Sequence, residues 1–156
     1  MSAKQEVTIN AARIPSIRDI VIQARPKQML KNGLVLVPLF FTVNIWYNSS
    51  DLSGMSSIIT RALAALGIFI LISAAVYFIN DSADAKKDRI HPRKRFRPIA
   101  AKRISVPWAV GIATLMIIGG LSSAYLISVP LLITTASYLS INIAYSWWIK
   151  NIILLD

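Results

Sequence analysis

The sequence contains no cysteine and little negative charge. Its 156 residues include 17 Lys and Arg, 7 Asp and Glu and a single His. The absence of cysteine excludes disulfides, thiolate nucleophiles and Cys-ligated zinc or iron–sulfur centres. A Gly-rich phosphate loop, a nucleophile elbow and a paired His–Glu metal motif are also absent, which excludes several common enzyme classes. The polar N-terminal segment has no short apolar core with a cleavage site, so we expect no secretory signal peptide.

Charged residues of both signs are scarce: they make up 15% of the chain, against 55% hydrophobic residues. Soluble domains contain about 25% charged residues, so an integral membrane protein is expected. The net charge of +10 lies in short segments between apolar runs. That arrangement favours membrane lipids and anionic ligands as partners over nucleic acid. The apolar runs predict an all-α polytopic membrane helix bundle with four transmembrane spans, at about 29–47, 58–79, 106–127 and 131–149.

Residues 1–24 form a predicted cytoplasmic arm, and residues 25–156 form the membrane domain. From Arg13 to Ala24 the apolar residues recur at helical spacing, and Ser16 and Asp19 are spaced as a capping box. This pattern predicts a short helix lying in the membrane interface, with a solvated arm as the alternative. Residues 48–57 are predicted to form a turn-rich loop.

The distribution of Lys and Arg predicts the orientation of the spans. Residues 1–32 carry six of them, the 80–103 segment carries nine, and the 48–57 and 128–130 segments carry none. Positive residues concentrate on the cytoplasmic side, so both termini and the 80–103 loop are predicted to be cytoplasmic. The expected location is the cell (inner) membrane, crossed four times.

The 80–103 segment begins with a cluster of carboxylates. If the second span continues as a helix, Asp81, Asp84 and Asp88 lie at i, i+3 and i+7, on one face. Like charges at this spacing repel unless a cation lies between them. Oxygen ligands without His or Cys suit Mg²⁺, and Asn80 adds an amide. We therefore predict a metal and phosphate site, with a solvated acidic patch as the alternative.

A basic run follows the carboxylates. The helix is expected to stop at His91, because a proline disfavours the helical conformation in the residue before it. Lys94 and Arg97 are the first candidates for phosphate ligands, since guanidinium and ammonium groups bind phosphate oxygens. The alternative is a basic anchor on anionic lipid. His91 is expected to be a hydrogen-bond donor at the helix end rather than a general base.

Four segments carry a resemblance to a known family. Residues 80–88, NDSADAKKD, resemble the first aspartate-rich motif of the UbiA superfamily of intramembrane prenyltransferases. Residues 89–100, RIHPRKRFRPIA, resemble the decaprenyl-phosphate phosphoribosyltransferase branch of that superfamily. Residues 25–32, RPKQMLKN, and residues 145–150, YSWWIK, also fit this branch. The similarity covers nearly the whole chain.

The resemblance implies a Mg²⁺-dependent transfer of 5-phosphoribose from phosphoribosyl diphosphate to a polyprenyl (decaprenyl) phosphate, a step toward arabinose donors for cell-envelope glycans. Asp81, Asp84 and Asp88, with Asn80, would hold Mg²⁺ and the substrate diphosphate. The implied ligands of further phosphate oxygens are Arg25, Lys31, Lys94 and Arg97. Positioning and charge neutralisation would supply most of the catalysis.

Members of the superfamily have about nine membrane helices and a second aspartate-rich motif, so this chain is expected to be the N-terminal half of such a fold. The expected protein partner is a second copy of the chain, in a homo-oligomer, or a complementing C-terminal half. Lys102 stands where the branch usually has Gly. One alternative function is transfer of a prenyl chain from its diphosphate to an aromatic or other acceptor, and another is a non-catalytic membrane scaffold. The basic run favours phosphoribosyl diphosphate, which has a 5-phosphate to bind as well.

Overall fold

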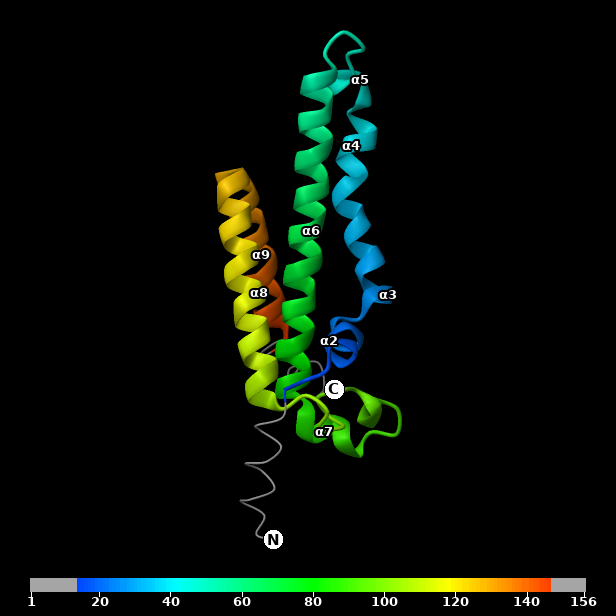
Figure 1. Cartoon of the computed structure of the whole chain (residues 1–156), viewed down its shortest axis with the longest axis vertical. Coiled ribbons are helices and arrows are strands. Elements are labelled where there is room, and N and C mark those ends of the chain that lie inside the picture. Colours follow the sequence, from blue (N-terminus) through cyan, green and yellow to red (C-terminus); the bar gives the residue numbers. More distant parts are fainter. Residues whose placement is uncertain (1–13, 147–156) are drawn as a thin grey trace.

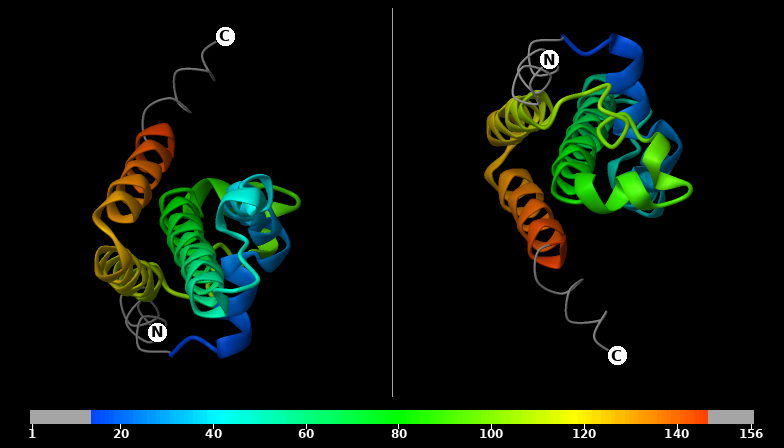
Figure 2. Two further views of the ribbon diagram at one scale, coloured as in Figure 1. Left: turned by 90° about the horizontal axis from the view of Figure 1, so that it is seen from above. Right: turned by 90° about the horizontal axis from the view of Figure 1, so that it is seen from below.

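The computed structural model describes residues 14–146, which form helices and turns with no strand. The all-α prediction is confirmed for this part of the chain. Helix α6 lies between the α8–α9 pair and the segments α2 to α5, as Figure 1 and Figure 2 show. The predicted arm before residue 14 and the end of the fourth span after residue 146, including Lys150, lie outside the described residues.

Helix α6, Leu52–Ala83, is the longest element. Its 32 residues span about 48 Å, more than the ~30 Å of a bilayer core. The helix begins at Asp51, whose carboxylate accepts hydrogen bonds from the Gly54 N–H at 2.9 Å and the Ser53 hydroxyl at 2.8 Å. These bonds hold the pKa of the Asp51 carboxyl below its usual value. The predicted loop at 48–57 is therefore wrong in its second half, because this cap starts the helix at Leu52 rather than at residue 58.

The first predicted span is helical but interrupted. Pro38 has no N–H to donate to the preceding turn, and the chain runs as a 3₁₀ helix before it. A second break occurs at Thr42, whose hydroxyl donates to the Pro38 carbonyl at 2.7 Å. The expectation of one continuous helix at 29–47 is therefore wrong. The pieces, which run beside α6, are α3 (Pro26–Met29), η1 (Leu30–Leu36), α4 (Val37–Phe41) and α5 (Val43–Trp46).

Helices α8, Val106–Ile127, and α9, Val129–Ala144, form an antiparallel pair. Ser128 lies between them and caps α9, since its hydroxyl accepts from the Leu131 N–H at 3.3 Å. Within the described residues, α6 and α8 are the helices long and apolar enough to cross a membrane, and α9 is a shorter apolar helix. Two of the four predicted spans therefore meet this criterion, and the count of four stays a prediction.

Residue size determines which face of α8 packs against the rest of the bundle. The buried residues of this helix are Ala109, Ala113, Gly120 and Ala124, which recur at helical spacing. A Cβ on Gly120 would lie 2.7 Å from Cδ1 of Ile72 in α6. Small residues let two membrane helices approach closely. Because the whole surface of such a helix is apolar, residue size rather than polarity determines which face packs.

The chain after α6 breaks at Asp84 and continues as α7, Ala85–Ile90. The Ser82 hydroxyl donates to the Phe78 carbonyl at 2.7 Å, a back-bond that bends helices. The expected unbroken helix through Asp88 is therefore wrong. Helix α7 does stop at Ile90, and His91 before Pro92 is extended, as predicted.

The rest of the loop is tied to the bundle by apolar side chains. Ile99 and Ile104 are buried in one cluster with Phe78 of α6. Arg103 adds an ion pair with Asp19 of α2 at 3.3 Å. These contacts fix the loop beneath the end of α6.

Lys102, at the position where the branch usually has Gly, adopts a left-handed backbone with φ of 59°. This conformation costs a side-chain-bearing residue about 1–2 kcal/mol.

Helix α2, Ile17–Ala24, is the predicted arm helix. Ser16 caps it as predicted, with its hydroxyl accepting from the Asp19 N–H at 3.2 Å. Ile20, Gln23 and Ala24 of the helix are buried or partly buried, whereas its Ile17 and Val21, and Ile14 just before it, are exposed. The helix is confirmed, and its place in the membrane interface stays a prediction.

Candidate active site at the end of α6

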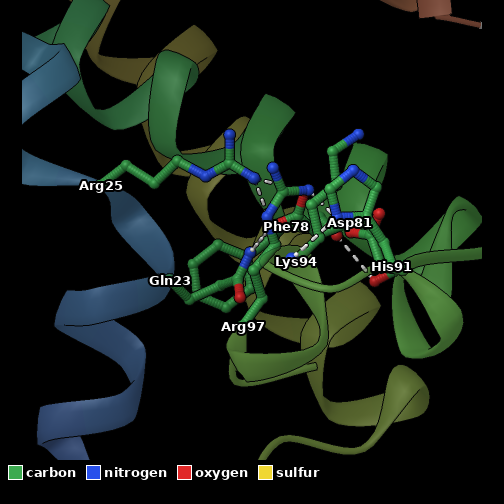
Figure 3. Close-up of polar contacts among 9 residues, drawn as sticks. Gln23, Arg25, Phe78, Asp81, His91, Lys94 and Arg97 are labelled. Atoms are coloured by element: carbon green, nitrogen blue, oxygen red, sulfur yellow. Dashed lines mark hydrogen bonds and ion pairs between the residues drawn. The ribbon is translucent and has the colours of Figure 1, made fainter. Parts of the chain in front are cut away.

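Asp81, near the C-terminal end of α6, is the centre of a polar network (Figure 3). Its side chain is 5% exposed, and both carboxylate oxygens lie 2.6 Å from Arg25 Nη2. Gln23 Nε2 donates to Oδ2 at 2.6 Å. The network joins α2 and the residue after it to α6, elements far apart in the sequence. A buried carboxylate requires such partners, because burial without them is costly.

Arg97 brings two of the predicted carboxylates together. Its Nη1 donates to Asp81 Oδ1 at 3.1 Å and to Asp88 Oδ2 at 2.7 Å. Asp88 is only 3% exposed. The predicted need for a cation between the aspartates is therefore met here by a guanidinium from the loop. The loop anchored by Ile99 places this guanidinium, so the apolar part of the motif positions its charged part.

Arg25 occupies a backbone position where glycine is usual. It ends α2 in the left-handed conformation, with φ of 56°, and its N–H bonds to the Ile22 carbonyl at 3.2 Å. Its guanidinium carbon also lies 4.8 Å from the centre of the Tyr77 ring, a cation–π contact. A side-chain-bearing residue held in this conformation points to a functional constraint, here the reach of the guanidinium to Asp81.

Gln23 is a positioning residue that the sequence interpretation missed. It is 1% exposed, and its Oε1 has no hydrogen-bond partner among the described residues. Gln23→Glu would place a second buried carboxylate against Asp81, so we expect it to lower the free energy of unfolding by at least about 2 kcal/mol at neutral pH. Thermal unfolding in detergent between pH 5 and pH 8 measures this, and the loss should shrink toward pH 5 as the new carboxyl binds a proton.

The matched control is Gln28→Glu, the same change at an exposed residue just after α2. Its unfolding temperature should stay close to that of the wild type across the pH range. Equal behaviour of the two variants would contradict the positioning role of Gln23.

A cavity of about 270 Å³ opens beside Asp81. The predicted residues that line it are Arg25, Asn80, Asp81, Asp84 and Arg97. Asp88 lies outside the lining and is paired with Arg97, while Lys31 and Lys94 are exposed and do not line it either. The structure therefore assembles most, but not all, of the predicted ligands in one place.

His91 acts as an acceptor, which corrects the expected donor role. Its Nδ1 accepts the backbone N–H groups of Arg93 and Lys94, each at 3.2 Å. The tight turn after Pro92 directs these two N–H groups back toward the ring. His91 thus shapes the start of η2, Lys94–Phe96, within the basic loop.

The donor set of the cavity suits Mg²⁺ bound together with substrate. Among residues 14–146, no three His, Asp or Glu side chains converge as a ready metal cage. Asp81, Asp84 and the Asn80 amide nevertheless line one cavity with two arginines. Protein sites for Mg²⁺ usually offer one or two carboxylates and leave the remaining positions to phosphate oxygens and water. The set fits such a complex, and the prediction that all three aspartates bind the metal stays a prediction.

The cavity also has a wall that the sequence interpretation did not identify. This wall includes Ser73 and Tyr77 of α6 and Tyr138 and Asn142 of α9. A signal existed in the sequence: residues 138, 142 and 145 are polar at helical spacing within an apolar run. Tyr145 and Ser146, part of the motif at 145–150, line the cavity as well.

Comparison with known proteins identifies the family. Residues 35–156 match the UbiA prenyltransferase family. The chain belongs to the UbiA prenyltransferase family. Members of this family are integral membrane proteins, in agreement with the long apolar helices α6 and α8.

Several known proteins are identical to the chain at about a third of the aligned positions. A decaprenyl-phosphate phosphoribosyltransferase of Mycolicibacterium smegmatis is 32% identical over 90% of this chain and 43% of its own length. The protein of the same name from Corynebacterium glutamicum is 34% identical over 90% of this chain and 42% of its own length. The nodulation protein NoeC of Azorhizobium caulinodans is 30% identical over 94% of this chain and 44% of its own length. The chain thus spans less than half the length of these relatives.

Proposed function

We propose that this UbiA-family chain contributes the cytoplasmic substrate site of an enzyme that transfers 5-phosphoribose from phosphoribosyl diphosphate to a polyprenyl phosphate. The observation that carries the proposal is the cavity in which Asp81, Asp84 and Asn80 lie beside Arg25 and Arg97. Carboxylates for a metal ion and guanidiniums for phosphate oxygens are the two groups that a diphosphate leaving group requires. The similarity to two proteins named decaprenyl-phosphate phosphoribosyltransferase supports the choice of substrates.

In the proposed reaction, the bond between ribose C1 and the diphosphate oxygen breaks, and its electron pair leaves with the diphosphate. An oxygen of the lipid phosphate then forms the new bond to the oxocarbenium-like C1. Arg25 and Arg97 would bind the phosphate oxygens, and Asp81 would orient both guanidiniums. Asp81, Asp84 and the Asn80 amide would hold Mg²⁺, which would supply positive charge opposite the leaving group, whereas Asp88, the third predicted ligand, lies outside the cavity lining and pairs with Arg97.

Membranes that contain the protein provide the test. They are incubated with phosphoribosyl diphosphate, decaprenyl phosphate and Mg²⁺, and the lipid fraction is analysed by mass spectrometry. The proposal expects a lipid whose mass has increased by one phosphoribosyl group, and its formation should stop when Mg²⁺ is chelated. Membranes without the protein are the control. Equal amounts of product with and without the protein would refute the proposal.

A second candidate is the transfer of a prenyl chain to an acceptor, supported by the description of the family as prenyltransferases. Both reactions release diphosphate, so the carboxylates and arginines serve either one. A competition assay separates them: membranes receive phosphoribosyl diphosphate and a prenyl diphosphate in equal amounts. Consumption of the first alone favours phosphoribosyl transfer, and consumption of the second alone favours prenyl transfer.

The proposed site lies on the cytoplasmic face of the cell membrane, with both termini on the same side. The absence of cysteine allows a direct test with single substitutions at exposed positions beyond the two ends of α6, Ser49 before it and Lys87 in α7. In intact cells, Lys87→Cys should resist a membrane-impermeant maleimide until the cells are lysed. Ser49→Cys, the matched position before α6, should react without lysis. The reverse pattern would place the Asp81 site outside the cell.

A further inference from the structure

Three side chains from three separate segments meet at the end of the cavity away from the charged residues. Ser73 of α6 lies 2.9 Å from the Tyr138 hydroxyl of α9, oxygen to oxygen. The Ser73 hydroxyl also donates to Asn32 Oδ1 of η1 at 3.2 Å. Ser73 and Tyr138 line the cavity that contains Asp81, whereas Asn32 does not. Polar groups within apolar helices are costly, so such a cluster indicates a function.

The number of hydroxyl protons in this cluster determines which groups donate hydrogen bonds and which accept them. A serine hydroxyl has one proton, and Ser73 gives it to Asn32 Oδ1. With the Ser73 proton directed to Asn32 Oδ1, Tyr138 is the donor in its bond to Ser73 Oγ, a contact whose distance of 2.9 Å suits either direction. Once its single proton is used, the Tyr138 oxygen presents acceptor lone pairs to the cavity. This end of the cavity accepts hydrogen bonds, while the arginine end donates them.

An acceptor end discriminates between ligand groups. A phosphate oxygen offers no proton to Tyr138 and would be repelled by its lone pairs. A hydrocarbon chain would leave the tyrosine oxygen unpaired, which is unfavourable away from water. An alcohol hydroxyl carries the proton that this oxygen lacks. The chemistry therefore fits the hydroxyl groups of a sugar.

We infer that the Ser73–Tyr138 end of the cavity binds the ribose hydroxyls of the donor substrate, while Arg25 and Arg97 bind its diphosphate. This inference rests on the proposed function and assigns the sugar and the leaving group to opposite ends of one cavity. Ser73 and Asp81 are separated by about two turns of α6, or roughly 12 Å along its axis. That separation places the two kinds of group at different points along one extended ligand.

Tyr138→Phe tests the inference, because it removes the hydroxyl and keeps the ring that packs edge-on against Phe69, with ring centres 5.5 Å apart. Purified protein in lipid nanodiscs is titrated with two probes in the presence of Mg²⁺, phosphoribosyl diphosphate and inorganic diphosphate. We expect the dissociation constant for phosphoribosyl diphosphate to rise about 5–10-fold, the worth of one hydrogen bond to a neutral group. The dissociation constant for inorganic diphosphate should change by less than about twofold, because that ligand has no sugar.

Tyr125→Phe is the matched control, since Tyr125 of α8 is 62% exposed and does not line the cavity. It should bind both probes as the wild type does. Unchanged affinity for phosphoribosyl diphosphate in Tyr138→Phe would overturn the inference. So would an equal loss for both probes, which is what a purely structural bond between α6 and α9 would produce.

The outcome for the sugar site can be separated from the outcome for the reaction. If the wild type makes no phosphoribosylated lipid, but Tyr138→Phe weakens only phosphoribosyl diphosphate, the sugar site is supported and the transfer is refuted. If the wild type makes the lipid and Tyr138→Phe binds both probes normally, the transfer is supported and the sugar site is refuted.

Discussion

Asp81→Asn should lower phosphoribosyl transfer on the order of 10²–10³-fold, the largest effect expected of any single substitution in this chain. The substitution keeps the shape of the side chain and removes the charge that both Arg25 and Arg97 contact. Without that charge the two guanidiniums lose their common partner, and the cavity loses a carboxylate for Mg²⁺. The rate of lipid product formation at saturating donor measures the loss.

The same variant should also be less stable. Removing one partner of a fully buried ion pair costs about 3–5 kcal/mol. The side chains of Arg25 and Arg97 remain 21% and 28% exposed, so water compensates in part and a loss of about 2–3 kcal/mol is expected. Asp51→Asn is the matched control, because asparagine caps a helix as well as aspartate does and Asp51 is exposed. Wild-type activity in Asp81→Asn would contradict the assignment of the site.

Arg97→Ala should lower activity by about 10²-fold and also change how the protein responds to Mg²⁺. Arg97 is the contact that Asp81 and Asp88 share, at 3.1 and 2.7 Å. Its removal leaves Asp88 buried without this cation, so the unfolding temperature should fall. Because Mg²⁺ can replace the missing positive charge, millimolar Mg²⁺ should raise the unfolding temperature of Arg97→Ala more than that of the wild type.

Arg93→Ala is the matched control for Arg97→Ala, since Arg93 belongs to the same basic loop and is exposed. Its activity, its unfolding temperature and its response to Mg²⁺ should stay near those of the wild type. The substrate-free response of the unfolding temperature to Mg²⁺ is independent of turnover. Identical Mg²⁺ responses in the wild type and Arg97→Ala would show that the guanidinium does not occupy the place of a cation.

The helical pattern of the fold was predictable because apolar runs and helix-capping residues act locally. Ser16 caps α2, and Pro92 ends α7 where the sequence predicted. The interruption at Pro38 and the early start of α6 at Leu52 were not predicted, because the spans were assigned from runs of apolar residues, and such runs indicate neither feature. The face of α8 that packs was also missed, since it depends on the close approach of Gly120 to Ile72 rather than on polarity.

The candidate site was predictable where a single motif carries it, and Asp81, Asp84 and Asn80 do line one cavity. Long-range partners were harder to predict. The contact of Gln23 with Asp81 joins residues that are far apart in the chain, and no local spacing indicates it. Lys94 was favoured for its place in the basic run, yet it is exposed and outside the cavity, whereas Arg97, three residues later, lines it.

Binding of phosphoribosyl diphosphate to the purified protein, measured with and without Mg²⁺, tests the central claim most directly. The account predicts saturable binding that requires Mg²⁺, weakens strongly in Asp81→Asn and persists in Asp51→Asn. Binding of equal strength without Mg²⁺ and in Asp81→Asn would contradict it, because the ligand would then be held by groups other than the carboxylate at the centre of this cavity.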